Sequence, residues 1–127
     1  MIIKTGKPRA TAEECGSSML AIKDALYVLN GKWKLPVIVS LVGGPKRFNE
    51  IQRAVGDITP KILSKELREL EMNGLLVRRV EPTIPVTVTY VLTEYSDSLH
   101  DVLEELKNWG TQHRRKVMGE HKGASEL

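Results

Sequence analysis

The sequence feature that most constrains the fold is a helix with both of its ends marked, over residues 59–74. Thr59 stands directly before Pro60. A threonine hydroxyl can cap a first turn, and proline loses nothing at the first helical position, because the N–H there has no partner within the helix. Gly74 can adopt the left-handed conformation that ends a helix, which lets Leu75 contact Leu70. The sequence therefore predicts a helix over residues 59–73.

A shorter amphipathic segment stands directly before this helix. Asn49 and Gln52 have the spacing of a capping box, so we expect a short helix that begins at Asn49. Gly56 then opens a tight turn. A short helix, a tight turn and a longer helix have the proportions of a helix-turn-helix over residues 49–73. Because pairs of amphipathic helices are common, topology alone is weak support for any function.

Hydrophobic spacing predicts the remaining elements. We expect a helix from Ser18 to about residue 29, a central helix over residues 32–42 that is buried nearly all round, strands at residues 76–80 and 86–92 with a loop at 81–85, and a long last helix from Thr93. The fold class is then α+β and mainly α. It is a winged helix-turn-helix, with a two-stranded β-hairpin as the wing and with flanking N- and C-terminal dimerisation helices.

The length of 127 residues leaves room for one hydrophobic core. We expect an N-terminal arm at residues 1–15, a DNA-binding domain with its dimerisation helices at 16–112, and a basic C-terminal tail at 113–127. The single cysteine, Cys15, excludes an internal disulfide and favours a reducing cytoplasm. No apolar run is long enough to cross a membrane, so we expect no membrane partner.

One face of the predicted helix 59–73 carries the functional prediction. Leu63, Leu67 and Leu70 define its buried side, and a row of hydrogen-bond donors with no acidic member defines the other. Such a row can donate to guanine O6 and N7 in the major groove, and basic residues around it can contact phosphates. The candidate DNA-binding residues are Lys46, Arg47, Arg53, Thr59, Pro60, Lys61, Ser64, Lys65, Arg68, Arg78 and Arg79.

Other interpretations of the same residues stay open. A charged stripe on a lone helix is most often a solvated face, and the net charge of +3 permits a polyanion partner without requiring one. A winged helix can also serve as a protein-binding module without DNA. A small enzyme is the least favoured class, because we find no catalytic constellation, no metal-ligand spacing and no cofactor motif.

Several segments resemble the HxlR-type family of winged helix regulators, which are relatives of the MarR group. The matching segments are GKW at 31–33, GPKRFNEI at 44–51, ITPKIL at 58–63 with LRELE at 67–71, and Pro85 before the second strand. The resemblance extends over roughly residues 15–110. It implies a recognition helix at 59–73, a dimer built from the first and last helices, a two-fold operator, and gene regulation that often responds to an oxidant or a reactive small molecule.

A wide apolar stripe on the last helix, together with the first helix, predicts a seam for a second copy of the chain. The candidate dimer-interface residues are Met19, Ile22, Leu26, Leu99, Val102, Leu103, Leu106 and Trp109. Two recognition helices about 34 Å apart can then read successive major grooves of a pseudo-palindromic operator. Cys15 precedes the predicted first helix, where the resembling family often carries a redox-responsive thiol. The alternative is an inert thiol.

Overall fold

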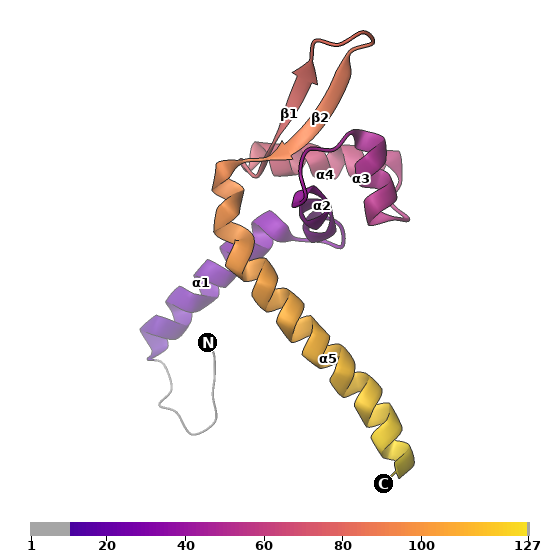
Figure 1. Ribbon diagram of the computed structural model, residues 1–127. Helices are drawn as coiled ribbons and strands as arrows, with labels where there is room; N and C mark the ends of the chain where they lie inside the picture. Colours follow the sequence, from indigo (N-terminus) through magenta and orange to yellow (C-terminus); the bar gives the residue numbers. More distant parts are fainter. Residues whose placement is uncertain (1–10, 127) are drawn as a thin grey trace.

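The computed structural model of the chain describes the backbone of residues 11–126 and the side chains of residues 11–119. The elements are α1 (Ala12–Leu29), α2 (Lys34–Leu41), α3 (Phe48–Val55), α4 (Pro60–Met72), β1 (Leu76–Glu81), β2 (Thr87–Leu92), the 3-10 helix η1 (Glu94–Leu99) and α5 (His100–Glu126). Their order confirms the predicted winged helix-turn-helix. In Figure 1 the hairpin and α5 extend in opposite directions from a body made by α2, α3 and α4. Of the predicted arm at residues 1–15, residues 1–10 lie outside the described residues, and residues 12–15 belong to α1.

The core fills the space between α2, α3, α4 and the base of the hairpin. Its fully buried side chains are Val37, Ile38, Leu41, Ile51, Leu63, Leu67, Leu70 and Leu76. The α4 members recur at spacings of three and four, so they form one face of the helix. Each fully buried aliphatic side chain stabilises the fold by roughly 1.5–3 kcal/mol relative to an exposed one. This packing fixes which side of α4 remains outside.

Both predicted ends of α4 are confirmed. The Thr59 hydroxyl accepts a hydrogen bond from the Ile62 N–H at 3.2 Å and so caps the helix. Gly74 has a φ of 78°, in the left-handed region. The N–H of Leu75 donates to the carbonyl of Leu70 at 3.0 Å, and the N–H of Gly74 donates to that of Glu71 at 3.0 Å. This Schellman pattern turns the chain directly into β1.

The hairpin is antiparallel, and Leu76 pairs with Leu92 at its base. A third piece of backbone joins it, because Lys46 forms an isolated bridge with Tyr90. The Lys46 N–H donates to the Tyr90 carbonyl at 3.1 Å, and the Tyr90 N–H donates to the Lys46 carbonyl at 2.8 Å. The loop before α3 is therefore fastened to the wing.

The start of α1 differs from the prediction. The helix begins at Ala12 instead of Ser18, because Thr11 and Glu14 form a capping box. The Thr11 hydroxyl accepts from the Glu14 N–H at 3.1 Å, and the Glu14 carboxylate accepts from the Thr11 N–H at 3.3 Å. Apolar spacing starts only at Met19 and gives no signal for the earlier turn. Cys15 therefore lies inside the helix, and not in front of it as predicted.

The start of α3 also differs. The helix begins at Phe48, and the Glu50 carboxylate accepts from the Arg47 N–H at 2.7 Å, so the predicted cap at Asn49 is wrong. Gln52 donates instead to the carbonyl of Ile58 at 3.0 Å and closes the tight turn. The predicted spacing of three residues is present, but between Arg47 and Glu50 instead of between Asn49 and Gln52.

The central helix α2 is less completely buried than predicted. It spans Lys34–Leu41, and Val39 and the following Val42 are 56% and 63% exposed.

The last helix is preceded by η1, where the Thr93 hydroxyl accepts a hydrogen bond from the Ser96 N–H at 3.3 Å. It continues past residue 113, where we expected a tail. Among the described residues, no helix is long and apolar enough to cross a membrane.

Candidate nucleic-acid interface

The predicted donor row lies on the outside of α4. Lys61, Ser64, Lys65 and Arg68 are all exposed, whereas Leu63, Leu67 and Leu70 on the opposite side are buried. The row begins next to Thr59 and Pro60 at the amino end of the helix, where unpaired backbone N–H groups and the positive end of the helix dipole favour an anion. The arrangement can therefore donate hydrogen bonds along one helix face and accept negative charge at its start.

One carboxylate borders this row, which the sequence analysis did not foresee. The Glu69 Oε2 atom lies 3.9 Å from the Lys65 Nζ atom, one helical turn away. Both side chains are partly exposed, so the pair contributes little to stability. Its importance lies in its position, because Lys65 belongs to the donor row.

The remaining predicted phosphate contacts surround α3. Arg47 is exposed at the amino end of that helix and Arg53 is exposed in its last turn, where its Nε atom donates to the Asn49 carbonyl at 3.4 Å. Lys46 is half-buried beside the wing. The hydrogen bond from the Arg47 N–H, and the nearby Arg47 charge, hold the pKa of Glu50 below its ordinary value. An ionised Glu50 is thus the acidic neighbour of this basic cluster.

The two wing arginines are both exposed but lie on opposite faces of the hairpin. Arg78 pairs with Tyr90, and Arg79 pairs with Thr89. Paired residues of antiparallel strands point to the same side, and successive residues alternate. Tyr90 contacts the core, so Arg78 shares the face of the hairpin that is turned to the body. Arg79 shares the outer face.

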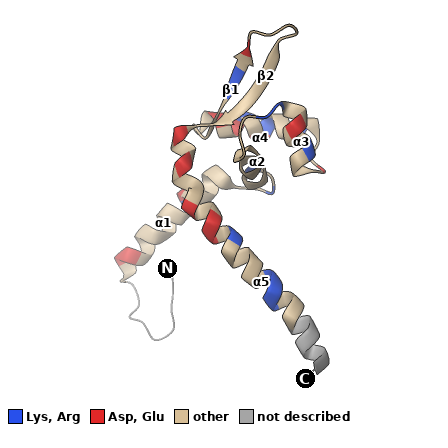
Figure 2. Cartoon of the chain, viewed as in Figure 1, with Lys and Arg blue, Asp and Glu red and all other residues tan. Residues whose placement is uncertain are grey.

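Charge is unevenly distributed along the chain. Figure 2 shows basic and acidic residues together on α3, α4 and β1, with basic residues on the loop before α3, whereas the charged residues of η1 and of the first turns of α5 are acidic. The acidic group consists of Glu94, Asp97, Asp101, Glu104 and Glu105. The elements of the predicted interface therefore differ in charge from the segment that connects the wing to α5.

A buried ion-pair cluster lies directly beneath α4, and sequence analysis missed it. Lys34 of α2 is only 3% exposed and Glu66 of α4 only 5%. The Lys34 Nζ atom lies 2.8 Å from Glu66 Oε1 and 2.6 Å from Glu69 Oε1. Burial lowers the pKa of Lys34, but the hydrogen bonds and negative charges of the two glutamates outweigh burial, so this pKa lies above its ordinary value of 10.5. The hydrogen bond from Lys34 likewise lowers the pKa of Glu69.

A signal for this cluster was present in the sequence. Lys34 stands three residues before Val37, on the buried stripe of α2, and Glu66 stands three residues after Leu63, on the buried stripe of α4. A charge on a buried face needs a partner of opposite sign. Two such charges on neighbouring helices predict that they meet.

The predicted dimer seam divides into two groups. Leu99 and Leu103 are half-buried and pack against the chain's own core. The other members are exposed large hydrophobic residues: Met19, Ile22, Leu26, Val102, Leu106 and Trp109. Trp109 also stacks on His113, with ring centroids 4.9 Å apart. Along α1 no side chain is fully buried. Val28 and Leu29 at its carboxyl end pack against the core, whereas Met19, Ile22 and Leu26 face outward in the single chain.

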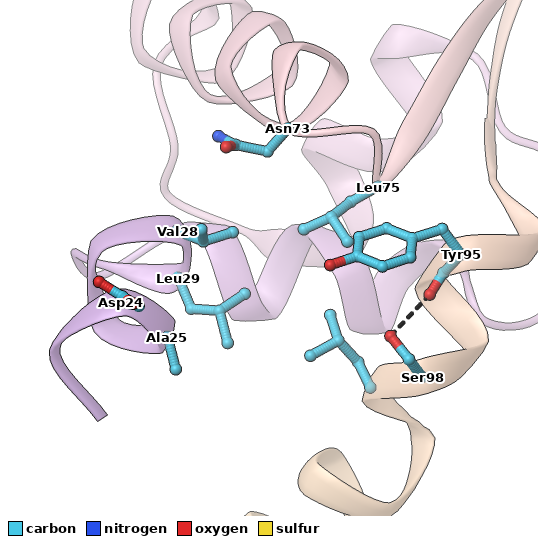
Figure 3. A pocket seen from close by; sticks show the side chains of 9 residues that line it. Asp24, Ala25, Val28, Leu29, Asn73, Leu75, Tyr95 and Ser98 are labelled. Carbon is cyan, nitrogen blue, oxygen red and sulfur yellow. Dashed lines mark hydrogen bonds between the residues drawn. The ribbon is translucent and has the colours of Figure 1, made fainter. Parts of the chain in front are cut away.

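A shallow pocket of about 330 Å³ lies where α1, the end of α4 and η1 meet. Figure 3 shows the apolar side chains of Val28, Leu29 and Leu75 on its walls, with Asp24 and Asn73 at its margin. The Tyr95 hydroxyl points into it, and the Ser98 hydroxyl donates to the Tyr95 carbonyl at 2.7 Å. Within the described residues, no group of three or more histidine, cysteine, aspartate or glutamate residues could hold a metal ion.

Comparison with known proteins agrees with this geometry. A family model described as an HxlR-like helix-turn-helix matches residues 28–118. The HTH-type transcriptional regulator YtcD of Bacillus subtilis is 39% identical over 101 residues, which cover 80% of each chain.

Two solved structures are similar as well. The redox regulator HypR in its reduced form superposes with a TM-score of 0.73 at 35% identity, covering 78% of this chain and 98% of that one. The quinone-bound YodB of B. subtilis superposes with a TM-score of 0.63 at 34% identity, covering 73% of this chain and 98% of that one.

Proposed function

The chain belongs to the HxlR-like helix-turn-helix family and is a DNA-binding transcription regulator, and from this premise we propose that α4 enters the major groove of double-stranded DNA. The observation that carries the proposal is the exposed donor row Lys61, Ser64, Lys65 and Arg68. Lysine and arginine donate to guanine, and serine can donate to several bases. The amino end of α4, at Thr59 and Pro60, faces the backbone or a base edge.

Around α4, the basic residues of neighbouring elements contact phosphates. Lys46, Arg47 and Arg53 belong to α3 and the loop before it, and Arg79 belongs to the outer face of the wing. Phosphate contacts fix the position of a protein on the duplex, and they carry no sequence information. Arg78 is the weaker candidate of the two wing arginines, because its face of the hairpin is turned to the body.

The regulator acts as a homodimer on a pseudo-palindromic operator. Support comes from the apolar side chains that α1 and α5 leave exposed, since a helix gains most of its stability by packing an apolar face. A second copy of the chain offers the same faces, and twofold symmetry presents two α4 helices to successive major grooves. We set aside the protein-only binding module, because the relatives are transcription regulators.

A binding assay with paired DNA duplexes tests the role of α4. The first duplex is an operator selected by the wild-type protein from a random-sequence pool, and the second is a scrambled duplex of the same length. We expect Lys65→Ala and Arg68→Ala each to weaken operator binding by about 1–3 kcal/mol and to reduce the preference for the operator. Lys46→Ala should weaken both duplexes alike and flatten the salt dependence.

Lys107→Ala is the matched control, because Lys107 is an exposed lysine on α5, outside the proposed interface. It should change neither affinity. The assignment of α4 is wrong if Lys65→Ala and Arg68→Ala weaken operator and scrambled DNA by the same factor.

The regulator responds to an oxidant or a small reactive molecule. This part of the proposal is supported by the relatives, one described as a redox regulator and one solved with a bound quinone. Cys15 is the only cysteine of the chain, so an oxidised disulfide has to join two chains or one chain and a small thiol. Hydrogen peroxide treatment should change operator binding by the wild-type protein. It should not change operator binding by the Cys15→Ser protein. An equal response of both proteins excludes Cys15 as the residue that responds to the oxidant.

The cytoplasmic location of the protein stays a prediction.

A further inference from the structure

The buried cluster beneath α4 connects the core to the donor row through a single carboxylate. Lys34 holds one oxygen of Glu69 at 2.6 Å, and the other oxygen of Glu69 lies 3.9 Å from Lys65. Lys34 is buried, whereas the side chain of Lys65 is 64% exposed. Glu69 therefore lies between a cation that solvent does not reach and a cation that faces outward.

Glu69 competes with DNA for Lys65. A carboxylate beside an exposed lysine attracts its ammonium group, and any phosphate or base has to draw that group away. The competition weakens when the carboxylate already has a closer cation. The contact to Lys34 is shorter than the one to Lys65, and its lysine is buried, so solvent screens it less and it is the stronger of the two.

Lys34 also compensates the second glutamate. Glu66 is nearly as deeply buried, and its Oε1 atom lies 2.8 Å from the same Nζ atom. Two carboxylates on the helix proposed to face a polyanion would oppose binding, because like charges repel across an interface. One buried lysine on α2 offsets part of this repulsion without occupying the surface of α4.

On these contacts, and resting on the proposed role of α4 in DNA reading, we infer that Lys34 is a positioning residue for sequence recognition. By holding Glu69 against the core, Lys34 leaves the Lys65 ammonium group available to a base edge. Without Lys34, Glu69 turns to Lys65, and the donor row loses one of its members although every residue of the row is still present.

The test measures operator preference, defined as the ratio of the affinities for selected operator and scrambled duplexes. A partly unfolded sample lowers both affinities by the same factor, so this ratio does not move when a variant is merely less stable. The variant is Lys34→Met combined with Glu66→Leu, which replaces a buried ion pair by apolar side chains and is therefore expected to fold. It leaves Glu69 with Lys65 as its neighbour. Lys32→Met is the matched control, since it removes the same charge two residues away, where Lys32 lies over the Trp33 ring.

We expect the double variant to lose operator preference by about tenfold, close to the loss caused by Lys65→Ala. Adding Lys65→Ala to the double variant should cause little further loss, because both changes remove the same contact. Adding Glu69→Gln should restore the preference, because the competing charge is gone. Lys32→Met should leave the ratio unchanged.

The inference is overturned if the double variant keeps the wild-type ratio, if its effect adds fully to that of Lys65→Ala, or if Glu69→Gln restores nothing. Failure of the underlying function looks different. If Lys65→Ala and Arg68→Ala leave the ratio unchanged in the wild-type background, the assignment of α4 itself is wrong.

Discussion

At the residue scale, the buried side chain of Lys34 has the largest expected effect on stability, because it pairs with a buried carboxylate. Lys34 and Glu66 are charged residues on two buried helix faces, and their pairing holds α2 against α4. Replacing such a pair by apolar residues is often neutral, whereas removing one member leaves an uncompensated buried charge. The cluster therefore predicts an asymmetry between single and double substitutions.

Lys34→Met is expected to lower the free energy of unfolding by about 3–5 kcal/mol, because Glu66 then lies buried without its cation. Urea unfolding followed by circular dichroism measures the loss. Combining Lys34→Met with Glu66→Leu should recover most of it. Lys32→Met removes an exposed lysine and should change stability by less than about 0.5 kcal/mol. Equal stabilities of the Lys34→Met and Lys32→Met proteins would contradict the burial argument.

The same cluster predicts a dependence of stability on pH. Folding lowers the pKa of Glu69 below its ordinary value of 4.5, so at acid pH the unfolded chain binds more protons. The stability that ionised Glu69 contributes is complete well above pH 4.5 and is lost as the pH falls through the lower, folded-state pKa. The stability difference between wild type and Glu69→Gln should therefore shrink between neutral and acid pH. Glu71→Gln, an exposed neighbour on α4, serves as the comparison, and a difference that grows towards acid pH would refute the pairing.

At the element scale, the helix ends that could be predicted were those marked by a residue type that fits only one position at a helix end. Pro60 and Gly74 fixed both ends of α4 because proline and a left-handed glycine each fit one place. The start of α3 was misplaced because Arg47 lacks a capping side chain, and the cap comes from Glu50 reaching back. The bridge between Lys46 and Tyr90 joins residues far apart in the sequence, so no local period could predict it.

Gly74→Ala tests the turn from α4 into the wing. Alanine at a φ of 78° is strained, and we expect a loss of roughly 1–2 kcal/mol in the free energy of unfolding. A Cβ atom there would also lie 3.9 Å from the Tyr95 ring, which is ordinary contact, so strain and not collision causes the loss. Gly43→Ala is the control, since that position has open space and should show no loss. If thermal unfolding shows that the two variants are equally stable, the left-handed conformation at residue 74 does not contribute to stability as proposed.

At the scale of the whole molecule, α1 and α5 are incompletely covered by the single chain. The sequence pattern predicted a seam but could not divide its residues, because one helical stripe can serve two purposes. Leu99 and Leu103 complete the core, while Leu106 and Trp109 stay exposed further along α5. The division follows from where α5 leaves the body, which depends on the tertiary fold.

Leu106→Glu should dissociate the proposed dimer, because a carboxylate placed in an apolar seam loses its hydration without gaining a partner. Light scattering on the protein eluted from a size-exclusion column measures its molar mass. Operator affinity should fall when the mass falls to that of a monomer. Ile84→Glu is the matched control, because Ile84 is fully exposed in the loop that joins β1 to β2. The hairpin extends away from α5 in Figure 1. A dimeric Leu106→Glu protein, or a monomeric Ile84→Glu protein, would show that the seam lies elsewhere.

The bridge at Lys46 and Tyr90 also has a mechanical consequence. Its two hydrogen bonds join the hairpin to the segment that leads into α3, so a movement of the wing relative to that segment has to break them. A tilt of the hairpin drags the Lys46 backbone with it and re-aims the start of the neighbouring helix. In the proposed complex with DNA, the hairpin and α3 would therefore bind the duplex as one rigid unit, and less conformational entropy would be lost on binding.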